Sequence, residues 1–164
     1  MTKLSAVISA FAAAGTMAVM GTAAAQSTTI KSTCQNVGGA AVEPFGTEPG
    51  HALRETTYSC TVNGGPLHGA ATTGTNIWHV RGNEWTLLTG QGAMRRPDGI
   101  AVHLVTEGTL AFQMKDGKVT GWTANGKGRY LAASGAGTPL GGKNYQWRVS
   151  PTGPTSFAIE TTVE

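Results

Sequence analysis

The sequence predicts an all-β protein, a single antiparallel β-barrel of about eight strands that follows an N-terminal signal peptide. Turn-forming residues recur at short intervals, and strand-length segments between them alternate apolar with polar side chains. Glycines also lie inside several of these segments, where a barrel needs bulges and sharp bends to close. No segment after residue 26 has a sustained helical period.

Residues 1–25 have the organisation of a signal peptide. Lys3 provides the positive start, residues 4–20 form an apolar core, and the alanines at 23–25 form an Ala-x-Ala cleavage site. Small and polar residues interrupt the apolar core and no stop-transfer pattern follows, so we expect export without stable membrane insertion. Export would end in the periplasm or outside the cell. Removing residues 1–25 from the 164 leaves 139, enough for one barrel domain at 26–164.

The charge of the expected mature chain is small. The sequence has 12 basic and 9 acidic residues, and only the basic Lys3 is lost with residues 1–25, which leaves a net charge near +2. The basic residues are scattered, with one adjacent pair at 95–96. A protein that follows a phosphate backbone carries a clustered basic patch, so we expect no nucleic-acid partner.

The two cysteines are predicted to pair. In an oxidising compartment Cys34 and Cys60 would form a disulfide, which closes a loop of about two dozen residues. The alternative is metal or redox chemistry, but the chain has no Cys-x-x-Cys sequence. The four histidines also lack the short paired spacing of a zinc site, so no metal is expected.

The first part of the mature chain is expected to contain one strand and one long loop. Residues 27–37 should form the opening strand that carries Cys34. Residues 38–53 include two prolines and are expected to be a loop of the kind that sits over a barrel mouth.

The remaining strands follow from turns and alternation. Asp116-Gly117 between two apolar segments is the strongest hairpin signal in the chain. Other turns are predicted at 63–66, 81–83, 97–99, 125–126 and 151–154. Four alternating series are expected to face the core: Ile100, Val102 and Leu104; Leu110, Phe112 and Met114; Tyr145, Trp147 and Val149; and Phe157, Ile159, Thr161 and Val163. Glycines inside predicted strands, expected at bulges and bends, are Gly74, Gly90, Gly92, Gly108, Gly121 and Gly128.

The segment 126–137 carries a resemblance to a known superfamily. It reads Gly-Lys-Gly-Arg-Tyr, then Leu-Ala-Ala-Ser-Gly-Ala-Gly, and it resembles the strand-and-turn signature of allene oxide cyclase and dirigent-type barrels and their small bacterial relatives. The resemblance covers about a dozen residues directly. It implies an eight-stranded antiparallel barrel with an apolar interior, and proteins that bind or act on hydrophobic small molecules. No catalytic residue of those enzymes aligns with this chain.

Aromatic residues are the candidate ligand contacts. An eight-stranded barrel is just wide enough to be packed by side chains or to hold one small ligand, and the sequence leaves both arrangements open. Trp122 is expected to contact a ligand or to be exposed, because only Thr120 and Ala124 share its face. Aromatic residues that could line a cavity also include Trp85, Tyr145 and Phe112, and the candidate ligand contacts chosen among them all are Trp78, Trp122, Tyr130 and Trp147.

No constellation in the sequence is a catalytic signature. His79 lies in a segment with two apolar faces and is predicted to be inside the barrel, and with Glu84 and Glu107 it is the only acid–base set to test. Exposed strand ends remain the alternative for both carboxylates. His103 is predicted to face solvent. A phosphate-loop spacing at 137–143 precedes a predicted strand instead of a helix, so we expect no nucleotide and no other cofactor.

The sequence therefore favours a protein that binds an apolar small molecule in its barrel, without deciding whether it is an enzyme. A cyclase or isomerase that acts on a hydrophobic substrate is the first alternative, because such an enzyme relies on cavity shape and leaves little sequence signature. A structural envelope protein is the second, and it would use its outer face to form a homo-oligomer or another contact.

Overall fold

The computed structural model describes residues 27–39 and 42–164, so the predicted signal peptide lies outside the described residues. The described chain is almost entirely β-structure, with one 3₁₀ turn, η1. The elements are β1 (Thr28–Gly39), β2 (Glu43–Pro44), β3 (His51–Val62), β4 (Ala71–Arg81), β5 (Glu84–Arg96), β6 (Gly99–Lys115), β7 (Lys118–Gly135), η1 (Thr138–Leu140), β8 (Asn144–Pro151) and β9 (Ser156–Val163). None of the described elements is a helix long and apolar enough to cross a lipid bilayer.

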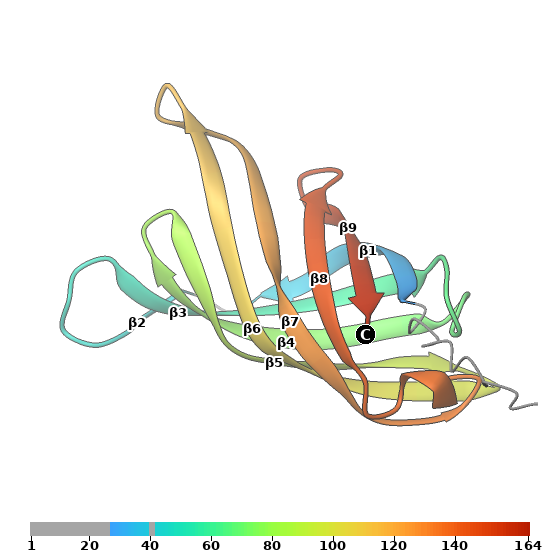
Figure 1. Cartoon of the computed structure of the whole chain (residues 1–164). Coiled ribbons are helices and arrows are strands. Elements are labelled where there is room, and N and C mark those ends of the chain that lie inside the picture. The colour runs from blue at the N-terminus through green and yellow to red at the C-terminus, as the bar shows by residue number, and fades with distance from the viewer. Residues whose placement is uncertain (1–26, 40–41) are drawn as a thin grey trace, which may run out of the picture.

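Eight long strands form a closed antiparallel barrel. From β3 to β9 each strand pairs with the next, while β1 pairs with β9 on one side and with β3 on the other. The pairing of β1 with β3 closes the barrel, and the short β2 adds only two residues beside β3. The predicted fold class, a single antiparallel barrel of about eight strands, is confirmed (Figure 1).

The two ends of the barrel differ. The β4–β5, β6–β7 and β8–β9 hairpins extend from one end, while η1 lies at the opposite end (Figure 1). That opposite end is filled by fully buried apolar side chains, among them Leu67 from the β3–β4 connection and Leu140 from η1. These side chains close the barrel interior at the η1 end.

The strongest turn prediction is confirmed, and a weaker one is wrong. Asp116 and Gly117 both have positive φ, at 51° and 73°, which is the geometry that a two-residue hairpin turn requires. Asn125-Gly126, in contrast, is not a turn, because β7 continues through it to Gly135. Gly126 instead lies opposite Trp147 of β8, whose ring packs against it.

The interior face of β6 changes along the strand. Ala101, His103 and Val105 are buried, so the predicted core series Ile100, Val102 and Leu104 is wrong and these three side chains point outward. Leu110 and Phe112 do face the interior, as predicted. A register shift between Val105 and Glu107 explains the change, since one extra residue moves every later side chain to the other face.

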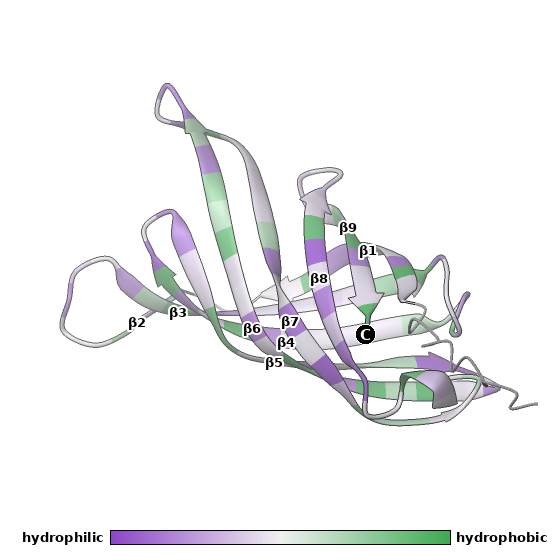
Figure 2. Ribbon diagram, viewed as in Figure 1, coloured by the Kyte–Doolittle hydropathy of each residue, from purple (hydrophilic) through white to green (hydrophobic). Residues whose placement is uncertain are grey.

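The two C-terminal strands alternate as predicted. Tyr145, Trp147 and Val149 of β8 are buried, as are Phe157, Thr161 and Val163 of β9. Figure 2 shows this on β8, where strongly hydrophilic residues alternate with less polar ones along the strand. One face of each strand is therefore available to the barrel interior.

The predicted disulfide is confirmed. Cys34 and Cys60 lie directly opposite each other in the β1–β3 pair, with their Cα atoms 4.0 Å apart, and their sulfurs are bonded. The bond therefore crosses the seam at which the barrel closes. A stable disulfide is typical of proteins outside the reducing cytosol.

Candidate functional site in the barrel interior

An internal cavity extends along the barrel interior, from Trp85 and Phe112 near the hairpins to Thr72 and Met94 nearer the η1 end. Its volume is about 320 Å³, at the lower end of the range for small-molecule sites. All eight barrel strands contribute lining residues, together with Pro154 and Thr155 of the β8–β9 turn. The cavity is thus part of the barrel architecture and not a depression on its surface.

Aromatic rings form much of the cavity wall. Trp85 lies edge-on to Phe112 at 5.2 Å between ring centroids and 6.3 Å from Trp78. On another part of the wall Trp122 lies 6.1 Å from Phe157. Trp85, Phe112 and Trp122 keep part of their surface exposed, so apolar area faces the space. A molecule that covered these rings would gain the free energy of removing that area from water.

Glycines keep the interior open despite these rings. At four positions an interior ring lies across a glycine directly opposite it on the neighbouring strand, and a Cβ on that glycine would meet the ring at less than 3 Å. The absence of a side chain lets each ring lie against the wall instead of across the lumen. The ring–glycine pairs are Tyr58 with Gly74, His103 with Gly92, Tyr145 with Gly128, and Trp147 with Gly126. The glycines predicted for bends therefore include three that make room for rings.

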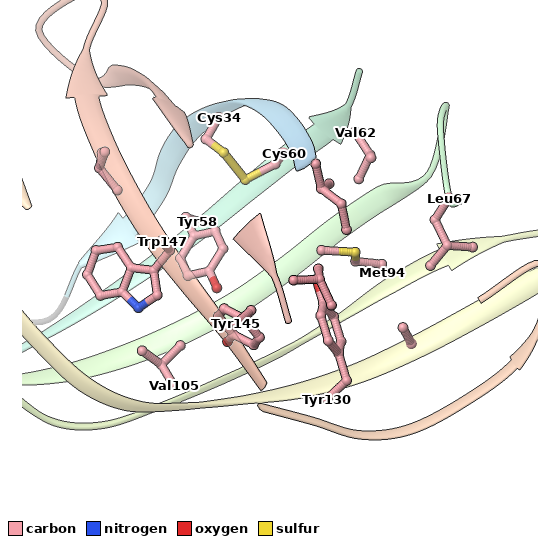
Figure 3. Close-up of a cluster of buried hydrophobic side chains, with 14 of the residues drawn as sticks. Cys34, Tyr58, Cys60, Val62, Leu67, Met94, Val105, Tyr130, Tyr145 and Trp147 are labelled. Carbon is pink, nitrogen blue, oxygen red and sulfur yellow. A yellow bond between two sulfur atoms is a disulfide. The ribbon is translucent and has the colours of Figure 1, made fainter. Parts of the chain in front are cut away.

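His103 lies on the cavity wall among tyrosines. It is only 6% exposed, so the prediction that it faces solvent is wrong. Its Nε2 lies 3.3 Å from the Tyr58 hydroxyl, and the rings of Tyr130 and Tyr145 stand edge-on to it. Figure 3 shows Tyr58, Tyr145 and Trp147 around one interior space, with Tyr130 toward the Leu67 end. A hydropathy pattern predicts an exposed histidine, but this ring is hydrogen-bonded to Tyr58 and packs against Gly92, which has no side chain.

Burial determines the protonation of these groups. It lowers the pKa of His103 to about 4 and raises the pKa of Tyr58 to about 12, because both charged forms lose their hydration. Burial likewise raises the pKa of Tyr130 and Tyr145 above the ordinary value for tyrosine. At neutral pH His103 and these tyrosines are therefore all uncharged, and they offer a ligand hydrogen bonds without a formal charge.

The low pKa of His103 makes the fold sensitive to acid. Between about pH 6.5 and 4 the unfolded chain binds a proton at this histidine and the folded barrel does not, so stability falls as the pH falls. From pH 7 to 4.5 we expect His103 to account for a loss of about 2–3 kcal/mol in the free energy of unfolding. Urea titrations at the two pH values should show a smaller loss for His103→Gln than for the wild type by about this amount.

His68→Gln is the matched control for this measurement, because His68 is exposed. It should lose as much stability as the wild type on acidification. Equal losses in the wild type and His103→Gln would contradict the predicted role of His103 in acid sensitivity.

Polar atoms without partners gather at the cavity. Among the described residues, the buried side-chain atoms that make no hydrogen bond are Arg54 Nε, Thr72 Oγ1, Asn76 Oδ1 and His103 Nδ1. All four residues line the cavity. Each unsatisfied polar atom costs about 1–3 kcal/mol, so such atoms require an explanation. Hydrogen-bonding groups of a bound molecule or of water would satisfy them.

The predicted ligand contacts lie together. Trp78, Trp122, Tyr130 and Trp147 all line the cavity, although whether they bind a ligand remains a prediction. The polar part of the lining was not predicted from the sequence, chiefly Arg54, Tyr58, Thr72 and His103. One signal could have found two of these residues, since residues 54, 56 and 58 share the face of Cys60 on an alternating strand, and Cys60 must reach Cys34.

The predicted acid–base set does not lie together in the interior. His79 is on the outer face of β4, against Phe45 and His51, so the prediction that it lies inside the barrel is wrong. Glu84 and Glu107 are exposed, and Glu107 pairs with Lys127 at 3.2 Å. None of the three acid–base candidates lines the cavity.

The predicted loop over the mouth is also different. Residues 51–53 belong to β3, and Phe45 packs against the outer His79. Residues 42–50 contribute nothing to the cavity lining. In the part of the chain that the structure describes, no three His, Cys, Asp or Glu side chains are grouped as a metal site requires.

Comparisons with known proteins give a similar fold but no function. No protein-family model matches this chain, and no curated protein matches it. A similar solved structure is the crystal structure of a protein with unknown function from Clostridium acetobutylicum ATCC 824. The two superpose with a TM-score of 0.58 at 10% sequence identity, over 85% of this chain and 99% of the other. This similarity shows that the barrel architecture occurs elsewhere.

Proposed function

We propose that this protein binds a small, largely apolar molecule inside its barrel. The observation that carries the proposal is the coincidence of an aromatic-walled cavity with all four buried, unpartnered side-chain atoms of the described chain. Binding sites for small molecules are mostly apolar with a few convergent polar groups, and this cavity has that composition.

The ring–glycine pairs support binding over a filled interior. Eight-stranded barrels without a ligand are packed by their own side chains. Here glycine stands opposite four interior rings, which draws them toward the wall and leaves the space between them. A barrel that served only as a structural block would gain stability by filling that space with side chains, because an empty cavity costs free energy.

Proton-transfer catalysis is a second candidate, supported by one observation. His103 Nε2 and the Tyr58 hydroxyl are hydrogen-bonded to each other at the cavity, and His103 Nδ1 has no partner among the described residues. A neutral histidine at a substrate-sized space can accept or donate a proton. A cyclase or isomerase of the allene oxide cyclase or dirigent type would use this pair, in place of the outward-facing His79 and Glu107.

The setting of the protein is proposed to be outside the cytosol. The Cys34–Cys60 disulfide supports this, since such bonds persist in oxidising compartments. Residues 1–25 would act as the export signal and be absent from the mature protein.

A neutral fluorescent probe tests the binding proposal. N-phenyl-1-naphthylamine, titrated into the purified protein, should gain fluorescence saturably as it leaves water. Val105→Phe places a larger side chain at the cavity and should weaken binding about 10-fold or more, because it removes volume that the probe needs. Native mass spectrometry of the exported protein should in addition detect any retained ligand.

Val119→Phe is the matched control, since Val119 is 57% exposed. It should bind the probe as the wild type does. Absence of saturable binding would refute an open internal site. So would a Val105→Phe variant that keeps the Tm of the wild type and binds the probe as tightly as the wild type does.

A further inference from the structure

We infer that the ligand is an organic acid, with its anionic group bound by Arg54 and its apolar body among the aromatic rings. This inference rests on the proposed binding function and specifies the chemical class of the ligand. Arg54 lies on β3, half-buried on the interior face. Its position places a permanent positive charge inside an otherwise uncharged cavity wall.

Arg54 contacts an aromatic ring but pairs with no carboxylate among the described residues. Its guanidinium carbon lies 5.0 Å from the centre of the Trp85 ring, within the range of a cation–π contact. Its Nε is buried without a hydrogen-bond partner. The ion pairs that Lys and Arg side chains form among the described residues are Lys31–Glu160, Arg96–Asp98 and Lys127–Glu107. Arg54 is in none of them.

The charge of the lining points to the missing partner. Among the described residues that line the cavity, Arg54 is the only one with a permanent charge, and there is no Asp, Glu or Lys. Burying part of a guanidinium without a counter-charge costs desolvation free energy, and the binding of a carboxylate offsets that cost. The charge balance is therefore completed by a negative group brought by the ligand.

The geometry suits a carboxylate. Packing against Trp85 restricts the guanidinium, and a restricted planar fork can donate two parallel N–H bonds to one carboxylate. Tyr58 follows Arg54 by four positions on β3, which at the strand rise is a distance of about 13 Å. A molecule that spanned part of this length would place its acid at Arg54 and its apolar body beside Trp78, whose ring reaches Thr56 between the two.

Two probes that differ in one charged group test the inference. 8-Anilinonaphthalene-1-sulfonate and N-phenyl-1-naphthylamine share the same rings, and only the first carries an anion. The wild type should bind the anionic probe about 10-fold or more tightly than the neutral one, in line with the strength of charged hydrogen bonds. Arg54→Met keeps the apolar stem and should bring this ratio to about 1, with little change in the affinity for the neutral probe.

Arg129→Met is the matched control, because Arg129 is exposed and outside the cavity lining. It should keep the wild-type ratio. Arg54→Lys keeps the charge without the fork and should give an intermediate ratio, which provides a second test if Arg54→Met does not fold.

The outcomes separate the two proposals. If both probes bind the wild type equally, or if the anionic preference survives in the Arg54 variants, the acid is excluded while the neutral probe still supports a binding cavity. If neither probe binds saturably, the proposed binding function fails and the inference fails with it.

Discussion

Replacing Gly126 by alanine is expected to destabilise the barrel by about 3 kcal/mol or more. A Cβ at this position would lie 2.0 Å from the carbonyl oxygen of Glu107 and 2.6 Å from the Trp147 ring. The first of these atoms is backbone in the neighbouring strand, so the clash is relieved only if the β6–β7 pairing shifts. Overpacking of this kind costs about 1–3 kcal/mol, and more when the backbone itself must move.

Gly121→Ala in the same strand is the matched control. Its Cβ would meet only Gln113 Oε1, at 3.0 Å, and that flexible side chain can move. We expect its free energy of unfolding to stay within about 1 kcal/mol of the wild type. Urea unfolding of both variants makes the comparison, and similar stabilities would show that the close packing of Trp147 over Gly126 does not constrain the strand pair.

Removal of the disulfide should have an effect of similar size. Cys34 and Cys60 are 26 residues apart, and a cross-link of that span lowers the entropy of the unfolded chain by the equivalent of about 3–4 kcal/mol. The bond joins β1 to β3, the pair that closes the barrel. Substitution of both cysteines by alanine should therefore reduce stability by about this amount, and the Tm by roughly 10 °C.

A reductant supplies the internal control. Once dithiothreitol has reduced the disulfide of the wild type, the Tm of the wild type should fall toward that of the double variant. The Tm of the double variant should not change with dithiothreitol. A double variant as stable as the oxidised wild type would mean that strand pairing alone holds the seam closed.

These effects bear on function through the cavity wall. Trp147 and Cys60 both line the cavity, so a shift of β7 or an opening of the β1–β3 seam would change its shape. We therefore expect Gly126→Ala to weaken binding of N-phenyl-1-naphthylamine even at temperatures at which it remains folded. The same fluorescence titration measures this change, and wild-type affinity in a folded Gly126→Ala would contradict it.

Much of the fold was predictable because it depends on residue types that are close together in the sequence. Turn residues separate the strands, Asp116-Gly117 specifies a hairpin by its backbone preferences, and two cysteines allow only one pairing. The site was less predictable. Its aromatic members were found by composition, whereas Arg54 and His103 were not, since polar residues on alternating strands are normally placed outside.

By itself the sequence determined the fold class, an antiparallel barrel of about eight strands, together with the disulfide and the aromatic content of the interior, because each depends on residue type and near neighbours. Only the tertiary structure decided which face of β6 is inside and that His79 is outside. A register shift of one residue reverses every later side chain, and it depends on the neighbouring strand. The cavity was decided in the same way, since it exists where glycines of one strand lie opposite rings of the next.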